Sequence, residues 1–369
     1  MSVILNQYAK LLVQYCLYLQ KNEKILIRTT PLAEPLLKPL YQHILRIGAQ
    51  PEIQLSFEHQ QKLFYENASS NLLASVSPFY QYAVQHFDAI LTIDAPYHRT
   101  ELQNIDPQKR LTVQNAHAKT KELLIQRSAN KKLKWTSCIY PTKSLAEHAE
   151  MPLNEFEEFV FNACFLMESN PINCWKSLGK TQEKIVTFLN YKRQFRFIGP
   201  QTDISFSTEN RLWQNSDGKR NMPSGEVFTS PVEESVNGHI YFSYPTLYNS
   251  QNVSDISLEV KNGTIINWNA KKGKNVLDHV FSIPGARQFG EVAIGTNKHI
   301  KKATKNILFD EKIGGSIHMA IGSSYPETGG KNTAAIHWDM IKDMKNGQII
   351  ADDELIYENG RFKNNLFNL

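Results

Sequence analysis

The first half of the chain alternates between segments with helical spacing of apolar residues and short apolar runs. Residues 8–19 and 36–47 carry apolar side chains three and four positions apart, as in amphipathic helices. We expect strands at the apolar runs 24–28, 88–94 and 133–140, and also at residues 52–57, where polar and apolar side chains alternate. Strands separated by helices need crossover connections, which favour a mainly parallel sheet. The pattern therefore predicts an α/β domain in the N-terminal half.

The second half of the chain has a different, β-rich pattern. Residues 153–167 and 181–193 are expected to form helices that border the two halves. Beyond them, β-branched runs and turns dominate, and Asn262-Gly263 separates two such runs as in a tight hairpin. A chain of 369 residues also favours two domains. We therefore expect an α/β N-terminal domain over residues 1–194 and a β-rich α+β C-terminal domain over residues 195–369.

Composition and charge narrow the class of protein. Hydrophobic residues make up 41% of the chain and charged residues 21%, so a core can form without disulfide bonds. The formal net charge is +5, but the lysines and arginines are scattered and accompany no zinc-finger or RNP-like motif. This distribution argues against nucleic-acid binding. The four cysteines form no CxxC pair, as expected of reduced thiols in a cytosolic protein.

The sequence lacks the patterns that direct a chain into or across a membrane. No apolar stretch approaches the roughly 18 residues that a spanning helix needs. Residues 1–24 have neither the basic start nor the small-residue cleavage site of a signal peptide. We therefore expect a cytoplasmic protein without membrane association.

The densest group of chemically capable residues lies between positions 318 and 339. His337 and Asp339 are two residues apart, so on an extended strand their side chains point to the same face. They can then share one metal ion, although Asp339 can equally orient His337. His318 has apolar neighbours, a setting more typical of a histidine packed in a core. Tyr325 lies in a turn-rich loop, where a phenol either packs or donates to a reacting oxygen.

Three glutamates upstream supply further carboxylates. Glu226 follows a Pro-Ser-Gly turn, where a glutamate considered alone is usually a solvated surface residue. Glu291 adjoins the apolar run Val292-Ala293-Ile294, which makes a functional role as reasonable as a surface one. Glu311 is compatible with an ordinary helix or loop charge.

These carboxylates and imidazoles are stronger evidence as a set than singly. They suffice for two divalent ions about 3.5–4 Å apart that share a carboxylate or a water. Oxygen ligands mixed with imidazole suit Zn²⁺, Co²⁺ or Mn²⁺. The sequence has no GxSxG elbow and no papain-like cysteine motif, so a covalent nucleophile is disfavoured.

The motifs also occur in a familiar order between residues 221 and 339. They are Gly225-Glu226-Val227-Phe228-Thr229, Gly290-Glu291-Val292-Ala293-Ile294-Gly295, Phe309-Asp310-Glu311-Lys312, His318-Met319-Ala320-Ile321-Gly322, Tyr325-Pro326 and His337-Trp338-Asp339. In this respect the chain resembles the M29 family of metalloaminopeptidases, of the aminopeptidase T and aminopeptidase S type.

The resemblance implies a site, an activity and an assembly. The implied metal ligands are Glu226, Glu291, Glu311, His318, His337 and Asp339. Glu291 would bridge the ions, Glu291 or Glu311 would be the general base, and Tyr325 would be a metal neighbour or an oxyanion donor. Two divalent ions per chain (Zn, Co, Mn or Mg) would activate the water that releases N-terminal amino acids from short peptides. The C-terminal domain would be the catalytic one, and the protein a homodimer.

Two other readings of the same residues stay open. The superfamily scaffold also hosts a mononuclear Fe(II) ring-cleaving dioxygenase, in which His318, His337 and Asp339 would form a 2-His-1-carboxylate triad. Glu226 and Glu291 would then be superfluous. A non-catalytic binding protein on a degenerate peptidase fold is the third reading, against which the intact ligand set argues.

Overall fold

The computed structural model describes residues 2–249 and 251–363. Its contacts divide the chain into two compact units. The first comprises Met1–Ile172 with Lys219–Pro223, and the second comprises Asn173–Gly218 with Ser224–Leu369. The domain boundary after residue 194 stays a prediction, because a domain is defined by independent folding and compactness does not test that.

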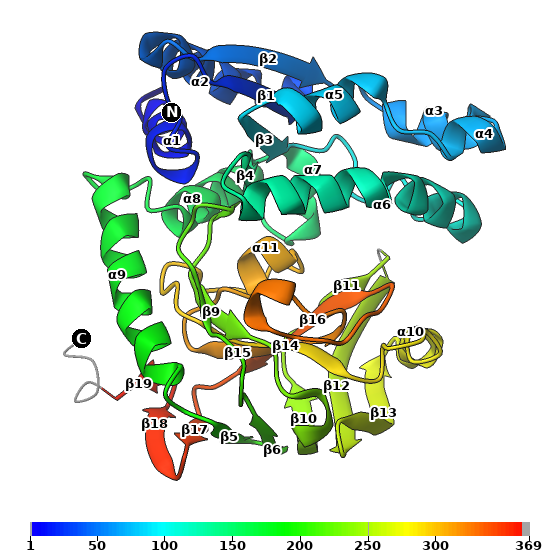
Figure 1. Cartoon of the computed structure of the whole chain (residues 1–369), viewed down its shortest axis with the longest axis vertical. Coiled ribbons are helices and arrows are strands. Elements are labelled where there is room, and N and C mark those ends of the chain that lie inside the picture. The colour runs from blue at the N-terminus through cyan, green and yellow to red at the C-terminus, as the bar shows by residue number, and fades with distance from the viewer. Residues whose placement is uncertain (1, 250, 364–369) are drawn as a thin grey trace. The chain divides into compact units, whose positions relative to one another are not determined.

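A parallel sheet forms the centre of the first unit. Its strand order is β2-β1-β3-β4-β8, and every neighbouring pair is parallel. Figure 1 labels the first four of these strands. The strands are β1 (Lys24–Thr29), β2 (Gln50–Leu55), β3 (Ala89–Asp94), β4 (Lys134–Ile139) and β8 (Asn221–Met222). The predicted α/β architecture with a mainly parallel sheet is therefore confirmed, and β8 is an addition from the later part of the chain.

One helix precedes these strands, and the others lie between them in the chain. They are α1 (Ser2–Leu11), α2 (Glu34–Ile47), α3 (Gln60–Asn67), α4 (Ser70–Leu73), α5 (Pro78–His86), α6 (Pro107–Ala129), α7 (Lys143–His148) and α8 (Leu153–Ala163), with the 3₁₀ turn Pro31–Ala33 before α2. The first helix begins earlier than predicted because Leu5 already belongs to its buried stripe. It passes into a π-helical turn, Leu12–Cys16. Among the described residues, no helix is both long and apolar enough to cross a membrane.

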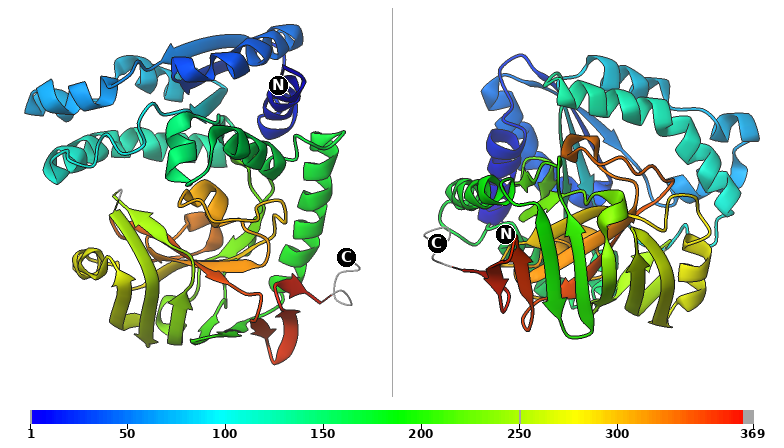
Figure 2. Two further views of the ribbon diagram at one scale, coloured as in Figure 1. Left: turned by 180° about the vertical axis from the view of Figure 1, so that it is seen from behind. Right: turned by 60° about the horizontal axis from the view of Figure 1, so that its bottom comes forward.

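The second unit is built mainly of antiparallel strands. One sheet has the order β11-β12-β10-β6-β5-β17-β18-β19, with β13 paired to β12, and these strands lie side by side in Figure 2. They are β5 (Gln194–Gly199), β6 (Thr202–Ser207), β10 (Asn237–Phe242), β11 (Thr246–Tyr248), β12 (Gln251–Lys261), β13 (Thr264–Lys272), β17 (Gln348–Ala351), β18 (Glu354–Glu358) and β19 (Arg361–Phe362). The predicted hairpin at Asn262-Gly263 joins β12 to β13 and is confirmed.

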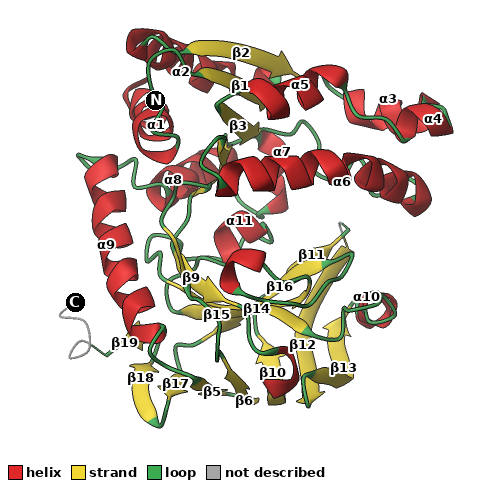
Figure 3. Ribbon diagram, in the orientation of Figure 1, coloured by secondary structure: helices red, strands yellow, loops and turns green. Residues whose placement is uncertain are grey.

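A second antiparallel sheet has the order β16-β15-β14-β9-β7. Its strands are β7 (Gln214–Ser216), β9 (Glu226–Thr229), β14 (Phe289–Gly295), β15 (Ser316–Gly322) and β16 (His337–Asp343). The helices of this unit are α9 (Pro171–Leu189), which begins in the first unit, α10 (Lys274–Val280) and α11 (Ile307–Asp310), with 3₁₀ turns at Glu233–Ser235 and Pro326–Thr328. Figure 3 shows this β-rich composition, which confirms the predicted α+β class.

The two faces of the β16-β15-β14-β9-β7 sheet differ in character. One face contributes apolar side chains to the main core, where they meet Phe195, Phe197 and Phe206 of the other sheet. Those apolar side chains are Val227, Val292, Ile294, Ile317, Met319, Ile321, Trp338 and Met340. Since side chains alternate along a strand, the residues between them point to the opposite face. That opposite face carries most of the residues predicted for the functional site.

Candidate metal centre

The strand register brings the predicted site residues together. Glu291 on β14, Ala320 on β15 and Asp339 on β16 lie in one row across the sheet. The adjacent row contains His318 opposite Ala293, and the rows beyond contain Glu226 opposite Gly295 and His337 opposite Gly322. Alanine or glycine therefore stands beside each acidic or histidine side chain. These small residues leave room on the face for the longer polar side chains to converge.

The converging side chains form two groups of three. Glu226, Glu311 and His318 make the first, here called the Glu226 group, and Glu291, His337 and Asp339 make the second, the Glu291 group. Within each group the potential ligand atoms lie within 4.8 Å of one another. All six residues that the sequence predicted as ligands are thus gathered in one region of the second unit.

Glu291 faces the histidines of both groups. Its Oε1 atom lies 3.6 Å from Nε2 of His318, and its Oε2 atom lies 3.1 Å from Nε2 of His337. The side chain is only 5% exposed. Asp339 is placed similarly, with Oδ1 3.8 Å from Nε2 of His318 and 3.6 Å from Nε2 of His337. The same-face orientation predicted for His337 and Asp339 is therefore observed.

His318 is more enclosed than its neighbours. It is 1% exposed, and its Nε2 atom lies 3.5 Å from Oε2 of Glu226. The apolar neighbours noted in the sequence do pack into the core, but the imidazole itself points to the polar face. Glu226 is buried as well, so it is not the solvated residue that its local sequence suggested.

Glu311 comes from outside the sheet. It follows α11 directly and is followed by Lys312, whose side chain is fully buried. The Lys312 ammonium contacts the Glu311 carboxylate and lies 3.5 Å from Oε1 of Glu226. Lys312 ends the sequence motif Phe309-Asp310-Glu311-Lys312, from which we predicted no role for it. Its position next to Glu311 was the available signal.

The contacts determine how these groups are charged. Burial lowers the pKa of His337, but the attraction of Asp339 and Glu291 outweighs it and raises the pKa to about 11. Burial opposes ionisation of Asp339, yet the neighbouring His337 holds its pKa at about 2. Burial likewise opposes ionisation of Glu291, but hydrogen bonds from His318 and His337 keep its pKa below the usual value. The cluster thus favours positive charge between its carboxylates.

Unsatisfied buried atoms show that a cation fits this arrangement. Oε2 of Glu226 and Oδ1 of Asp339 are buried without a hydrogen-bond partner, and both face Nε2 of His318. Such atoms are costly unless another group compensates them. Carboxylate oxygens and an imidazole nitrogen are also the donor atoms of zinc, cobalt and manganese sites. The residues present therefore suit divalent metal ions.

Tyr325 borders the cluster. Its ring centroid lies 5.0 Å from that of His337 and 5.7 Å from that of Phe228. The residue keeps 38% of its surface exposed. Partial burial, reinforced by the nearby carboxylates of Glu291 and Asp339, raises the pKa of the phenol, so it stays protonated and can donate a hydrogen bond. Phe228 was not singled out from the sequence.

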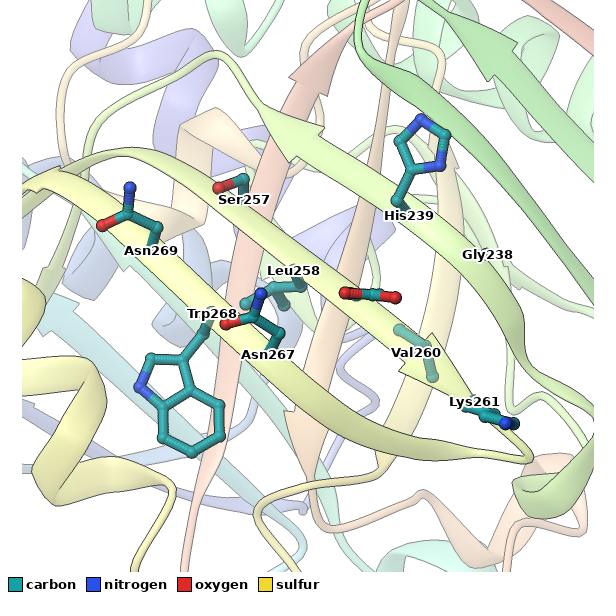
Figure 4. A pocket seen from close by; sticks show the side chains of 10 residues that line it. Gly238, His239, Ser257, Leu258, Val260, Lys261, Asn267, Trp268 and Asn269 are labelled. Carbon is teal, nitrogen blue, oxygen red and sulfur yellow. The ribbon is translucent and has the colours of Figure 1, made fainter.

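Two other features of the molecule share no residue with this cluster. Exposed Glu58, His59 and His98 in the first unit also lie within ligand distance of one another, and the two imidazoles stack at 4.8 Å. A hollow over β10, β12 and β13 is lined by His239, Ser257 and Trp268 among others (Figure 4). It contains none of the residues predicted for the site.

The fold and the cluster together define a class: a protein with an α/β unit and a β-rich unit, in which the β-rich unit gathers carboxylates and imidazoles that could hold divalent metal ions. Comparison with known families identifies the family within that class. The chain belongs to the M29 family of metalloproteases, whose profile, described as thermophilic metalloprotease, matches residues 2–362. Membership implies use of a divalent metal, and the family resemblance seen in the sequence is confirmed.

Curated relatives and solved structures are also similar to this chain. Aminopeptidase 2 of Geobacillus stearothermophilus is 25% identical over 354 residues, which cover 87% of this chain and 84% of that protein. The solved structure of wild-type AmpT from Thermus thermophilus is similar with a TM-score of 0.84 at 23% identity, covering 97% of this chain and 98% of that one. The 2,5-dihydroxypyridine dioxygenase of Pseudomonas putida KT2440 has a similar fold, with a TM-score of 0.58 at 13% identity and coverage of 97% and 96%.

Proposed function

We propose that this protein is a metal-dependent aminopeptidase that releases N-terminal amino acids from short peptides. The observation that carries the proposal is the position of Glu291, whose two carboxylate oxygens face His318 and His337 separately. A carboxylate so placed is suited to bridge two ions, one in each group. The relatives named aminopeptidases support the same activity.

The ligand assignment follows from the two groups. Glu226, Glu311 and His318 would hold one ion, and His337 and Asp339 the other, with Glu291 shared. Two divalent ions per chain, drawn from zinc, cobalt, manganese or magnesium, form part of the proposal. Bound there, such ions polarise a carbonyl and lower the pKa of water, which is the chemistry that peptide hydrolysis needs.

The side chains of this protein have separate tasks in that reaction. Glu291 or Glu311 would accept the proton of the attacking water and pass it to the leaving amine. The protonated Tyr325 phenol, beside His337, would donate a hydrogen bond to the oxyanion of the tetrahedral intermediate. The free α-amino group of the substrate would lie against a metal ion or a carboxylate of the cluster, which would restrict cleavage to the first residue.

Release of amino acids from aminoacyl-chromophore substrates tests the proposal. The protein is stripped with a chelator and then assayed with Co²⁺, Zn²⁺, Mn²⁺ or Mg²⁺ added back. We expect metal-restored cleavage of free-amine substrates and none of their N-acetylated forms. If no metal restores cleavage, the aminopeptidase proposal is wrong.

The similarity of the fold to that of a dioxygenase makes a mononuclear iron enzyme the main alternative function. A mononuclear iron enzyme would use His318, His337 and Asp339 and would bind one iron per chain. Against it, Glu226 and Glu291 lie in the same cluster, where a single iron does not need them. Elemental analysis separates the two, since oxygen consumption with one iron per chain would favour the dioxygenase. An inert protein without metal would favour a binding role.

Location and assembly complete the proposal. A cytoplasmic location is part of the proposal. Homodimer formation is proposed from the family resemblance alone, and light scattering coupled to size-exclusion chromatography tests it against the monomer mass of 42.3 kDa.

A further inference from the structure

Lys312 is a buried cation inside the proposed metal centre. Its side chain has 0% exposure, and its ammonium contacts Glu311 and lies 3.5 Å from Oε1 of Glu226. A charged lysine withdrawn from water needs carboxylate partners of this kind. Both partners belong to the Glu226 group, and both are proposed metal ligands.

The Glu291 group has no such internal cation. Among the ion pairs of the described residues, the partners of Glu291 and Asp339 are the imidazoles of His318 and His337. Lys312 forms no ion pair with either carboxylate, and its charge acts on Asp339 only as the last of the causes that lower the pKa of that carboxyl. An imidazole can lose its proton and become a ligand itself, whereas an ammonium group offers no lone pair to a metal. A metal ion that binds to the Glu226 group therefore meets a fixed positive charge, whereas one that binds to the Glu291 group meets imidazoles that can become ligands.

A metal ion in the Glu226 group would compete with the Lys312 ammonium for the same two carboxylates. A metal–oxygen bond is about 2.0–2.2 Å long for zinc. An ion bound to Glu226 and Glu311 would consequently lie close to the Lys312 ammonium, and like charges so close in a buried setting repel strongly. Before such an ion binds, the ammonium must also give up carboxylates that it already neutralises.

We propose that Lys312 makes the two metal positions unequal: the Glu291 group binds its ion tightly, and the Glu226 group binds a second ion weakly and exchangeably. This inference rests on the proposed two-metal function. It adds that the second ion exchanges with solution and that Lys312 sets its affinity.

Replacement of Lys312 by methionine tests the inference, because methionine keeps much of the length and removes the charge. Zn²⁺ or Co²⁺ alone is titrated into stripped protein against a chromogenic chelator, and bound metal is counted after dialysis. We expect the unmodified protein to retain one ion per chain and to bind a second about tenfold or more weakly. In Lys312→Met the second ion should bind at least about tenfold more tightly than in the unmodified protein.

Lys342→Met is the matched control. Lys342 is also a buried lysine of the second unit, but its ammonium donates to the carbonyl oxygen of Pro200 instead of contacting the cluster. Its replacement should leave both metal affinities as they are. Two ions of equal affinity in the unmodified protein, or an unchanged second affinity in Lys312→Met, would overturn the inference.

A second pair of variants does not depend on how Lys312→Met folds. Glu311→Gln should weaken only the second ion, and Asp339→Asn should weaken the first, tight one. The opposite assignment would overturn the inference. Hydrolysis with two equally tight ions would leave the aminopeptidase proposal intact and reject the role of Lys312. Two ions of unequal affinity without any hydrolysis would keep the role of Lys312 and reject the aminopeptidase proposal. Failure to bind any divalent ion would reject both proposals.

Discussion

The Nδ1 atom of His337 lies 2.8 Å from the carbonyl oxygen of Ser323, at the opposite edge of the ring from Nε2. A carbonyl oxygen only accepts hydrogen bonds, so Nδ1 must be the donor. In the neutral imidazole, Nε2 then keeps its lone pair and faces Glu291 and Asp339. This is the arrangement by which backbone groups orient histidine ligands in metal sites.

Replacement of Glu291 by glutamine should abolish turnover while leaving the fold intact. The amide keeps the size of the side chain but removes the charge that faces both histidines. We expect kcat to fall by at least about a hundredfold, as for loss of a general base, with an unchanged circular dichroism spectrum. Glu259→Gln, an exposed glutamate in a strand of the same unit, is the control and should keep full activity. Full activity in Glu291→Gln would exclude the bridging role.

Replacement of Tyr325 by phenylalanine should lower kcat more than it raises KM. The phenol would stabilise the oxyanion only as the intermediate forms, so its loss affects the transition state more than the bound substrate. A decrease in kcat of about 10²–10³ is typical for removal of one oxyanion donor. Steady-state kinetics on an aminoacyl-chromophore substrate measures both constants. Tyr191→Phe, at a tyrosine that is 79% exposed, serves as control. A change in KM alone would assign Tyr325 to substrate packing.

Divalent metal should raise the thermal stability of the stripped protein. Without a bound metal, the buried carboxylates of the cluster lie close together with unsatisfied oxygens on Glu226 and Asp339. Metal at 100 times its Kd should add about 2.7 kcal/mol to the free energy of unfolding. Differential scanning calorimetry with and without Zn²⁺ or Co²⁺ measures the change in Tm.

The metal-dependent rise in Tm should be largely lost in Asp339→Asn. It should persist in Asp353→Asn, because Asp353 is exposed and its left-handed backbone, with φ of 65°, also suits asparagine. An equal rise in both variants would place the stabilising ion elsewhere in the protein.

Only one of the four thiols should react rapidly in the folded protein. Cys16, Cys138 and Cys164 are buried, and burial raises the pKa of Cys138 to about 12, so its thiolate is scarce at pH 8. Cys174 is partly exposed. Titration with a disulfide reagent should count one fast thiol in native protein and four in guanidinium chloride. Cys174→Ser should remove the fast phase, and a fast phase that survives this replacement would contradict the burial of the others.

Local patterns were sufficient where a residue's role depends on its near neighbours. The alternation around His337 and Asp339 placed both side chains on one face, and Asn262-Gly263 marked the hairpin. Short apolar runs predicted β1 and β3, because a strand buried on both faces needs apolar residues throughout. The strand β2 was predicted from its alternation, and it is largely exposed. Relations between distant segments were not visible in this way, and the groups around Glu226 and Glu291 depend on the register of four strands.

Helix α6 shows why part of the fold was missed. Its buried side chains are limited to Thr120, so it has no apolar stripe from which to predict a helix. The signal that was present lay at its start, where Asp106 caps the helix and Pro107 occupies the first turn. The role of Lys312 was missed for a related reason. A lysine in a sequence normally predicts an exposed side chain, and the burial of Lys312 depends on the carboxylate of Glu226, which is distant in the sequence.

Glu311 is the one proposed ligand that does not come from the sheet. An ion held jointly by Glu311 on one side and by Glu226 and His318 on the other would act as a reversible cross-link between the segment after α11 and two strands. Such a link closes a loop in the chain and restricts its motion. The concentration of free metal would then control how rigidly the segment after α11 is held, as well as the chemistry of the site. The ion that restrains this segment would be the weakly bound, exchangeable one.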